Sequence, residues 1–181
     1  VSLVIGALIG IPLGILLVVT RKNGIWSNTI LHQVLNPIIN ILRSIPFIIL
    51  LIAIVPFTKL LVGTSIGTTA AIVPLTVYVA PYIARLVENS LLEVDDGIIE
   101  AAKAMGASPL QIIRYFLLPE ALGSLILAIT TAIIGLIGST AMAGAVGGGG
   151  IGDLALVYGY QRFDTIVIVI TVIVLIIIEI G

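Results

Sequence analysis

The chain has 181 residues, of which 60% are hydrophobic and only 9% are charged, whereas soluble domains carry about 25% charged residues to cover their water-facing surface. This composition, with a mean hydropathy of +1.31, predicts a membrane protein whose solvent is largely the bilayer. The net charge of −1 argues against nucleic-acid binding, and the absence of cysteine together with a single histidine excludes disulfides, thiolate catalysis and cysteine-ligated or histidine-ligated metal sites.

Apolar stretches of about the length that crosses a bilayer recur along the chain. They predict an all-α membrane domain over residues 1–181 with about five transmembrane helices, at Val1–Thr20, Pro37–Phe57, Ile66–Val87, Ala121–Val146 and from Thr165 to the end. The first stretch begins inside an apolar run, and the last one ends before it is long enough to span a membrane. We therefore expect the sequence to be truncated at both ends.

The first predicted helix carries Gly6, Gly10 and Gly14 at four-residue spacing. This spacing places three positions without side chains on one face, where another helix backbone can approach closely. The face is predicted to pack against a neighbouring helix of the same subunit, with a seam between two copies of the subunit as the alternative.

Basic residues predict the orientation, because short loops rich in lysine and arginine are retained in the cytoplasm. The segments after the first and third helices contain Arg21, Lys22, Arg85, Lys103 and Arg114, against Lys59 and Arg162 in the other two. The polar loop over residues 88–120 is therefore predicted to lie in the cytoplasm.

This loop is predicted to contain two short helices. Asp95 and Asp96 place negative charge at the start of the first helix, where the helix dipole favours it. Gly106 stands where a left-handed residue ends a helix. The run Ser108-Pro109-Leu110-Gln111 then has the pattern of a capping box with proline at the first helical position, so a second helix begins there.

The first of these short helices carries an apolar stripe. Its members recur at helical spacing and are Ile98, Ala101, Ala102 and Met105. A helix of about nine residues is not stable alone in water, so the stripe needs a partner. The periodicity leaves open whether the partner is the subunit's own helix ends or a groove on another protein.

The spacing Glu100-Ala101-Ala102, Gly106, Leu118-Pro119 resembles the EAA loop of ABC importer permeases, with Phe116 where isoleucine is usual. The resemblance implies the type I importer permease fold, in which residues 97–107 form a coupling helix inserted into a cleft of a separate nucleotide-binding subunit. The residues that it implies for coupling to the ATPase are Ile98, Ile99, Glu100, Ala101, Ala102, Met105, Gly106, Ala107 and Pro119.

Other local sequences are similar to the permeases of bacterial methionine uptake systems. They are Arg43–Phe47, Gly63–Gly67, Ala71–Thr76 and Ser139–Gly147. Permeases for polar amino acids and glycine betaine share the loop pattern and remain alternatives. The family implies a multi-pass location in the bacterial inner membrane, surrounding lipid, a second copy of the subunit, two cytoplasmic ATPases that hold ATP and Mg²⁺, and an external binding lipoprotein.

The chain has no G-x-x-x-x-G-K-[ST] loop of its own, and its glycine-rich run Gly147–Gly150 lacks the lysine that a phosphate site needs. That run is predicted to be a flexible or re-entrant turn, and ATP is predicted to bind to a partner. No hydrolase motif is present, so the chain is predicted not to be an enzyme. A self-contained channel or secondary carrier is the alternative from another class, and the absence of acidic residues in the middle of the predicted spans disfavours it.

Two residues are candidates for the transport pathway or its gate. Arg43 is a charge inside a predicted span, where a functional role competes with a side chain that reaches the inner interface. Met142 lies near the outer end of the fourth helix, where a flexible apolar gate competes with ordinary packing.

Overall fold

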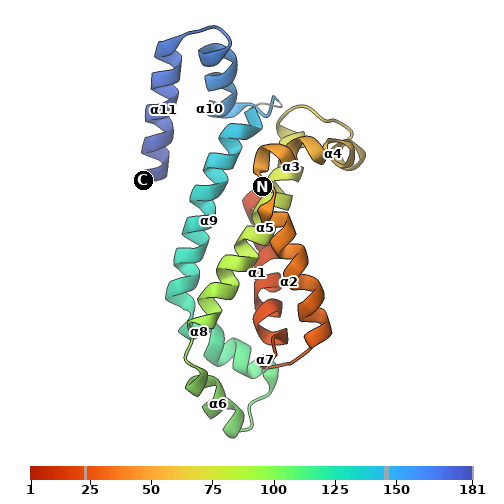
Figure 1. Ribbon diagram of the computed structural model, residues 1–181. Coiled ribbons are helices and arrows are strands. Elements are labelled where there is room, and N and C mark those ends of the chain that lie inside the picture. Colours follow the sequence, from red (N-terminus) through yellow and green to blue (C-terminus); the bar gives the residue numbers. More distant parts are fainter. Residues whose placement is uncertain (23, 145–146, 181) are drawn as a thin grey trace. The chain divides into compact units, whose positions relative to one another are not determined.

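The computed structural model describes residues 1–22, 24–144 and 147–180, and these form helices with no β-strand (Figure 1). The predicted end of the fourth span at Val146 and the last residue, Gly181, lie outside the described residues. The chain divides into two compact units. The first unit contains residues 1–3, 45–78 and 133–181, and the second contains residues 4–44 and 79–132.

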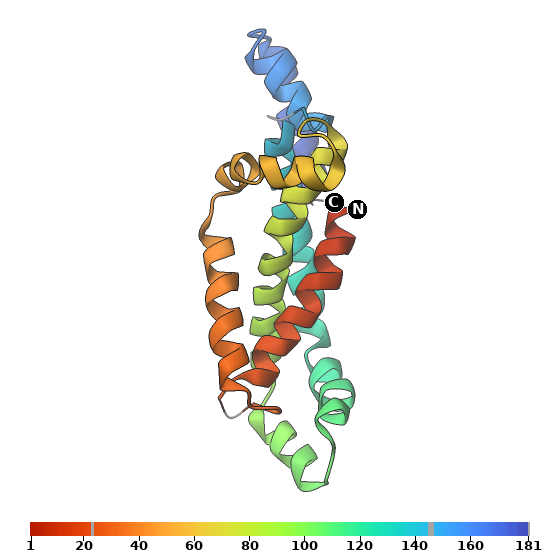
Figure 2. The ribbon, with the colours of Figure 1, turned by 90° about the vertical axis from the view of Figure 1, so that its right-hand side faces the viewer.

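In the second unit, α1 (Ser2–Thr20), α2 (Thr29–Ser44) and the latter part of α5 (Thr68–Leu92) run side by side, as Figure 2 also shows. Leu17, Ile39 and Ala84 form a buried cluster between these helices. The unit continues through α6 (Asp96–Ala104), α7 (Pro109–Ile112), a π-helical segment η1 (Ile113–Leu117), α8 (Leu118–Glu120) and the start of α9 (Leu122–Ala143).

The glycine face of α1 packs on α5. A Cβ atom at Gly10 would lie 2.5 Å from the carbonyl oxygen of Ala80, and one at Gly14 would lie 2.6 Å from that of Ala84. Real Cβ atoms do not approach backbone oxygen this closely, so only glycine allows the two helices to come together. The prediction that this face packs against a helix of the same subunit is confirmed.

We expect Gly14→Ala to destabilise the subunit by about 1–3 kcal/mol, because the added methyl group overpacks a contact with backbone that has no rotamer to change. The matched control is Gly123→Ala on α9, where a Cβ would meet nothing within 4 Å and alanine should be neutral or stabilising by up to about 1 kcal/mol. Thermal unfolding of the detergent-solubilised protein compares the two. Equal unfolding temperatures would contradict the tight α1–α5 contact.

The prediction of one continuous helix over Pro37–Phe57 is wrong. The helix begins earlier, at Thr29, and α2 ends at Ser44 before α3 (Phe47–Ala53) starts anew. Pro46 between them has an extended backbone, with φ −55° and ψ 136°, and a proline disfavours helical geometry in the residue before it. The N-terminal extension of α2 carries polar side chains whose partners lie on α1 and α5.

The number of helices that are long enough to cross a membrane also differs from the prediction. Three described helices are long and apolar enough to cross a membrane, namely α1, α5 and α9, or four if α2 and α3 together form one interrupted span. The fifth predicted span corresponds to α11 (Thr165–Ile180), which is apolar but shorter. Because α5 continues to Leu92, Glu88 lies within a helix rather than in the predicted loop over residues 88–120.

The first unit contains α3, α4 (Val55–Val62), the start of α5, the end of α9, α10 (Gly150–Asp153), a π-helical segment η3 (Leu154–Tyr160) and α11. Phe47 of α3 packs edge-to-face on Tyr78 of α5, with ring centroids 5.3 Å apart. The glycine-rich run leads into α10, whose first residue is Gly150, and three of its four glycines, Gly147, Gly149 and Gly150, have positive φ. A turn is therefore confirmed at this position, and its flexible or re-entrant character stays a prediction.

Candidate functional site

The helix α6 begins and ends with complete caps. The Asp95 side chain accepts a hydrogen bond of 2.7 Å from the backbone N–H of Gly97. At the other end Gly106 has φ +78°, its N–H donates to the carbonyl of Lys103 and the N–H of Ala107 donates to that of Ala102. This pair of bonds is a Schellman motif. Both ends of the predicted helix are confirmed, and the capping is what allows so short a helix to form.

The next helix starts at a capping box. The Ser108 hydroxyl accepts from the N–H of Gln111 at 3.4 Å, and the side-chain oxygen of Gln111 accepts from the N–H of Ser108 at 2.8 Å. The predicted second start is confirmed. The helix then widens into the π-helical segment η1, which ends two residues before Pro119 of α8. In a regular α-helix the proline ring would clash with the carbonyl four residues earlier, and proline has no N–H to donate to that carbonyl.

The residues predicted for coupling divide between two sides of the loop. Ala102 is fully buried, as are Ile112 of α7 and Leu117 of η1, the two elements on which α6 packs. In contrast, Ala101 and Met105 are exposed, as is the neighbouring Ala104, and 68% of Met105 is accessible. The apolar stripe therefore meets the subunit's own chain along one edge and leaves the other edge uncovered.

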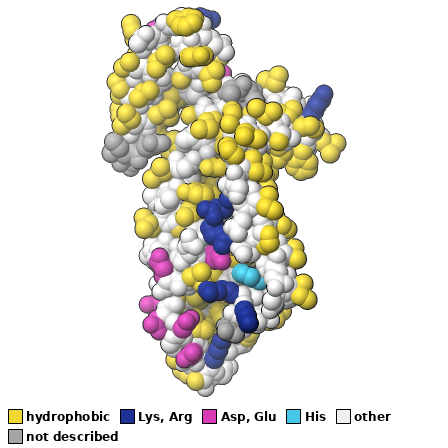
Figure 3. All heavy atoms as spheres, viewed as in Figure 1, with side chains coloured by type: hydrophobic (Ala, Val, Ile, Leu, Met, Phe, Trp, Pro, Cys, Tyr) yellow, Lys and Arg dark blue, Asp and Glu magenta, His cyan; other side chains and the backbone are white. Residues whose placement is uncertain are grey.

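The remaining predicted coupling residues have intermediate or high exposure. Ile98, Ile99 and Ala107 are half-buried, whereas Glu100, Gly106 and Pro119 are exposed. Ile99, Glu100 and Lys103 face a cleft of about 390 Å³ that is bounded on its other side by the residues after α1. Figure 3 shows basic and acidic side chains gathered over this part of the second unit.

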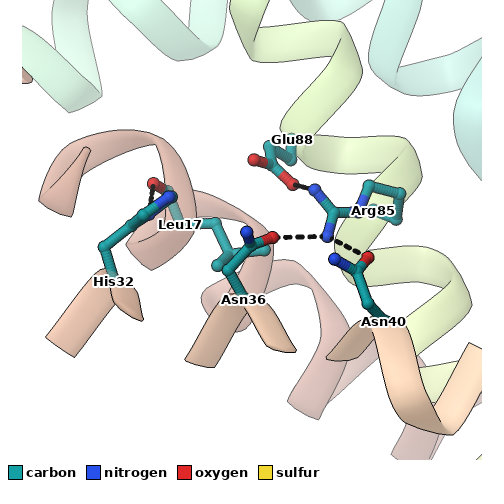
Figure 4. A network of polar contacts seen from close by, with 6 residues as sticks. All are labelled: Leu17, His32, Asn36, Asn40, Arg85 and Glu88. Atoms are coloured by element: carbon teal, nitrogen blue, oxygen red, sulfur yellow. Dashed lines mark hydrogen bonds and ion pairs between the residues drawn. The ribbon is translucent and has the colours of Figure 1, made fainter. Parts of the chain in front are cut away.

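A polar network that the sequence did not reveal ties α5 to α2 (Figure 4). The Arg85 guanidinium donates to Glu88 at 2.5 Å, to the Asn36 side-chain oxygen at 2.7 Å and to that of Asn40 at 2.6 Å. The side chains of Arg85 and Glu88 are 16% and 7% exposed. The four-residue spacing of His32, Asn36 and Asn40 in the sequence could have indicated this network, because it places the three side chains on one face of a helix.

His32 extends this face to α1, since its Nδ1 lies 3.1 Å from the carbonyl oxygen of Leu17. The side chains of His32, Asn36 and Asn40 are therefore bonded to the second unit's own helices. Arg43, in the last turn of α2, is exposed, and Met142 of α9 in the first unit is 50% exposed. Their roles at a gate stay predictions.

The long apolar helices are those of a multi-pass membrane protein. A loop between two of them holds α6, a short helix that is capped at both ends and partly exposed. Residues 10–180 match the family described as binding-protein-dependent transport system inner membrane component, and the chain belongs to this family. It is therefore a membrane subunit of a transport system, and the all-helical permease fold predicted from the sequence is confirmed.

Named relatives are similar over most of the chain. The probable D-methionine transport system permease protein MetI of Vibrio cholerae is 52% identical over 173 residues, covering 96% of this chain and 77% of that protein. The protein of the same name from Pasteurella multocida is 56% identical over 154 residues, covering 85% of this chain and 71% of that protein. A solved inward-facing structure of the MetNI methionine ABC transporter superposes with a TM-score of 0.95 at 52% identity, covering 98% of this chain and 82% of that one.

Proposed function

We propose that this chain is the permease subunit of an ATP-binding cassette importer that moves methionine across the bacterial inner membrane by alternating access. The support for methionine is identity above 50% with relatives named for D-methionine transport, together with the close superposition on a methionine transporter. Two copies of the chain would form the pathway, and an external binding protein would deliver the substrate.

The energy for transport comes from a separate ATPase. The sequence has no phosphate-binding loop with its lysine, so we assign the binding of the ATP phosphates to that subunit. In the proposed assembly, two cytoplasmic ATPase subunits hold ATP and Mg²⁺, and this chain is not itself an enzyme.

The observation that carries the coupling assignment is the uncovered edge of α6. A helix with both ends capped presents Ala101, Ala104 and Met105 to the outside, and two small side chains beside a flexible methionine suit insertion into a groove on a partner. The predicted coupling set contains Ala101 and Met105 of this edge together with residues that shape and support it, namely Ile98, Ile99, Glu100, Ala102, Gly106, Ala107 and Pro119.

The test is reconstitution of the subunit in liposomes with its ATPase and binding protein. We expect uptake of radiolabelled methionine only when the ATPase and ATP are both present. An ATPase variant without its phosphate-loop lysine is the matched control and should give no uptake. Methionine uptake by the subunit alone, without ATP, would refute the importer assignment and favour a channel or secondary carrier.

The same liposomes test the substrate. Binding proteins for glycine betaine or polar amino acids, each with its labelled substrate, should not support uptake above background. If one of them did and the methionine binding protein did not, the ABC importer would stand and the methionine assignment would fall.

A further inference from the structure

The two stems of the loop that carries α6 are hydrogen-bonded to each other. The Ser124 hydroxyl of α9 donates to the Glu93 carboxylate, just after α5, at 2.5 Å. The buried Ser90 hydroxyl of α5 lies 3.0 Å from the backbone carbonyl of Ser124 and 3.0 Å from that of Leu86 in its own helix, so its one proton is shared between them. We refer to Ser90, Glu93 and Ser124 as the stem clamp.

The geometry of Ser124 differs from that of other hydroxyls on α9. Those of Thr130 and Thr131 donate to the carbonyls of Ile126 and Leu127 in their own helix, as serine and threonine within helices commonly do. Ser124 reaches another segment instead, and its acceptor is the side chain of Glu93, which lies outside α9.

The stem clamp closes the loop at its base. The segment between Glu93 and Ser124 is itself packed, because α6 rests on α7 and η1 through the buried Ala102, Ile112 and Leu117. The loop is thus bonded at its base by the exposed Glu93 and the half-buried Ser124.

We propose that the stem clamp transmits displacement of α6 to α5 and α9 as one body, so that Glu93 and Ser124 are positioning residues for the coupling of ATP hydrolysis to transport. This inference rests on the proposed function, because it assigns the clamp a role in the movement that an ATPase drives. The Arg85 contacts with Asn36 and Asn40 would carry the same displacement on to α2.

The experiment measures methionine molecules transported per ATP hydrolysed by the reconstituted complex. Ser124→Ala and Glu93→Ala should each lower this ratio at least about fivefold, the lower end of typical coupling between sites, while ATP hydrolysis continues. Glu93→Gln keeps an acceptor oxygen and should stay near wild type. Thr131→Ala, which removes a hydroxyl bonded only within α9, is the matched control and should leave the ratio unchanged.

The combined Ser124→Ala/Glu93→Ala variant should be no worse than either single variant, because both remove the same bond. The proposed role of the stem clamp would be overturned if the losses of the two single variants added in the double variant. It would also be overturned if the single variants had the wild-type ratio of methionine transported to ATP hydrolysed. A wild-type complex that shows no ATP-driven uptake would instead refute the proposed function, so the two failures are distinguishable.

A second measurement tests the stem clamp if the alanine variants assemble poorly. The sequence contains no cysteine, so cysteines replacing Glu93 and Ser124 can be joined selectively by a short thiol cross-linker. We expect the cross-link to restore the ratio that the unlinked pair has lost. If cross-linking stops transport and its reversal restores it, the stems must separate during the cycle and the proposal is wrong.

Discussion

Gly106→Asp is expected to lower methionine uptake at least about tenfold while the isolated subunit stays folded in the membrane. A Cβ atom at Gly106 would meet nothing within 4 Å, and the residue is exposed, so the subunit itself does not oppose a side chain there. The positive φ of +78° adds a strain of about 1 kcal/mol, which asparagine and aspartate tolerate better than other residues. Any larger loss must arise in a complex, where a carboxylate beside the uncovered edge of α6 has to lose its water.

Gly106→Asn is the matched control, because it has the same shape and the same backbone strain without the charge. We expect it to bind the ATPase and to transport at close to wild-type levels, whereas the aspartate variant should fail to co-purify with the ATPase or should hydrolyse ATP without uptake. Co-purification, ATP hydrolysis and uptake are measured on the same preparations. Equal behaviour of the two variants would show that the residue faces no partner and would remove Gly106 from the coupling set.

The helix ends in the loop could be predicted because each depends on residues within a few positions of one another. Asp95, Gly106 and Ser108 act through hydrogen bonds to backbone groups two to five residues away, and such signals are written in the local sequence. The close packing face of α1 was also predictable, since only glycine at four-residue spacing lets backbones meet.

The start of α2 and the end of α5 could not be predicted from hydropathy. Polar residues at 29–36 resemble a loop by composition, but His32 and Asn36 find partners on α1 and α5, which are distant in sequence. Burial of a polar group is tolerable only with such a partner, so the helix boundaries depend on tertiary contacts. The stem clamp was missed for the same reason, because Glu93 and Ser124 are brought together only by the folded loop.

The division of the apolar stripe likewise required the structure. Periodicity places Ala102 and Met105 on one face of α6, and it does not distinguish a partner in the subunit itself from a groove on another protein. The fold buries Ala102 against its own chain and leaves Met105 exposed. The stripe thus anchors α6 and also presents an uncovered edge. Sequence spacing alone cannot show which residues of the stripe have which of these two roles.

Arg85→Leu is expected to destabilise the subunit by about 3–5 kcal/mol, the usual cost of removing one partner from a buried ion pair. The change leaves the Glu88 carboxylate, whose side chain is only 7% exposed, without its cation. It also removes the donor that Asn36 of α2 accepts from, so the contact between α2 and α5 is weakened. The loss should appear as a lower unfolding temperature in detergent and a lower level of protein in the membrane.

The variant Arg85→Leu/Glu88→Leu separates the unpaired charge from lost packing. With both charges replaced by apolar side chains, no buried ion remains to be neutralised, and such replacements are often neutral or stabilising. We therefore expect the double variant to unfold close to the wild-type temperature and well above the single variant. If it is as unstable as Arg85→Leu, the Asn36 and Asn40 contacts rather than the ion pair hold α2 on α5. If Arg85→Leu itself unfolds at the wild-type temperature, neither contact stabilises the second unit.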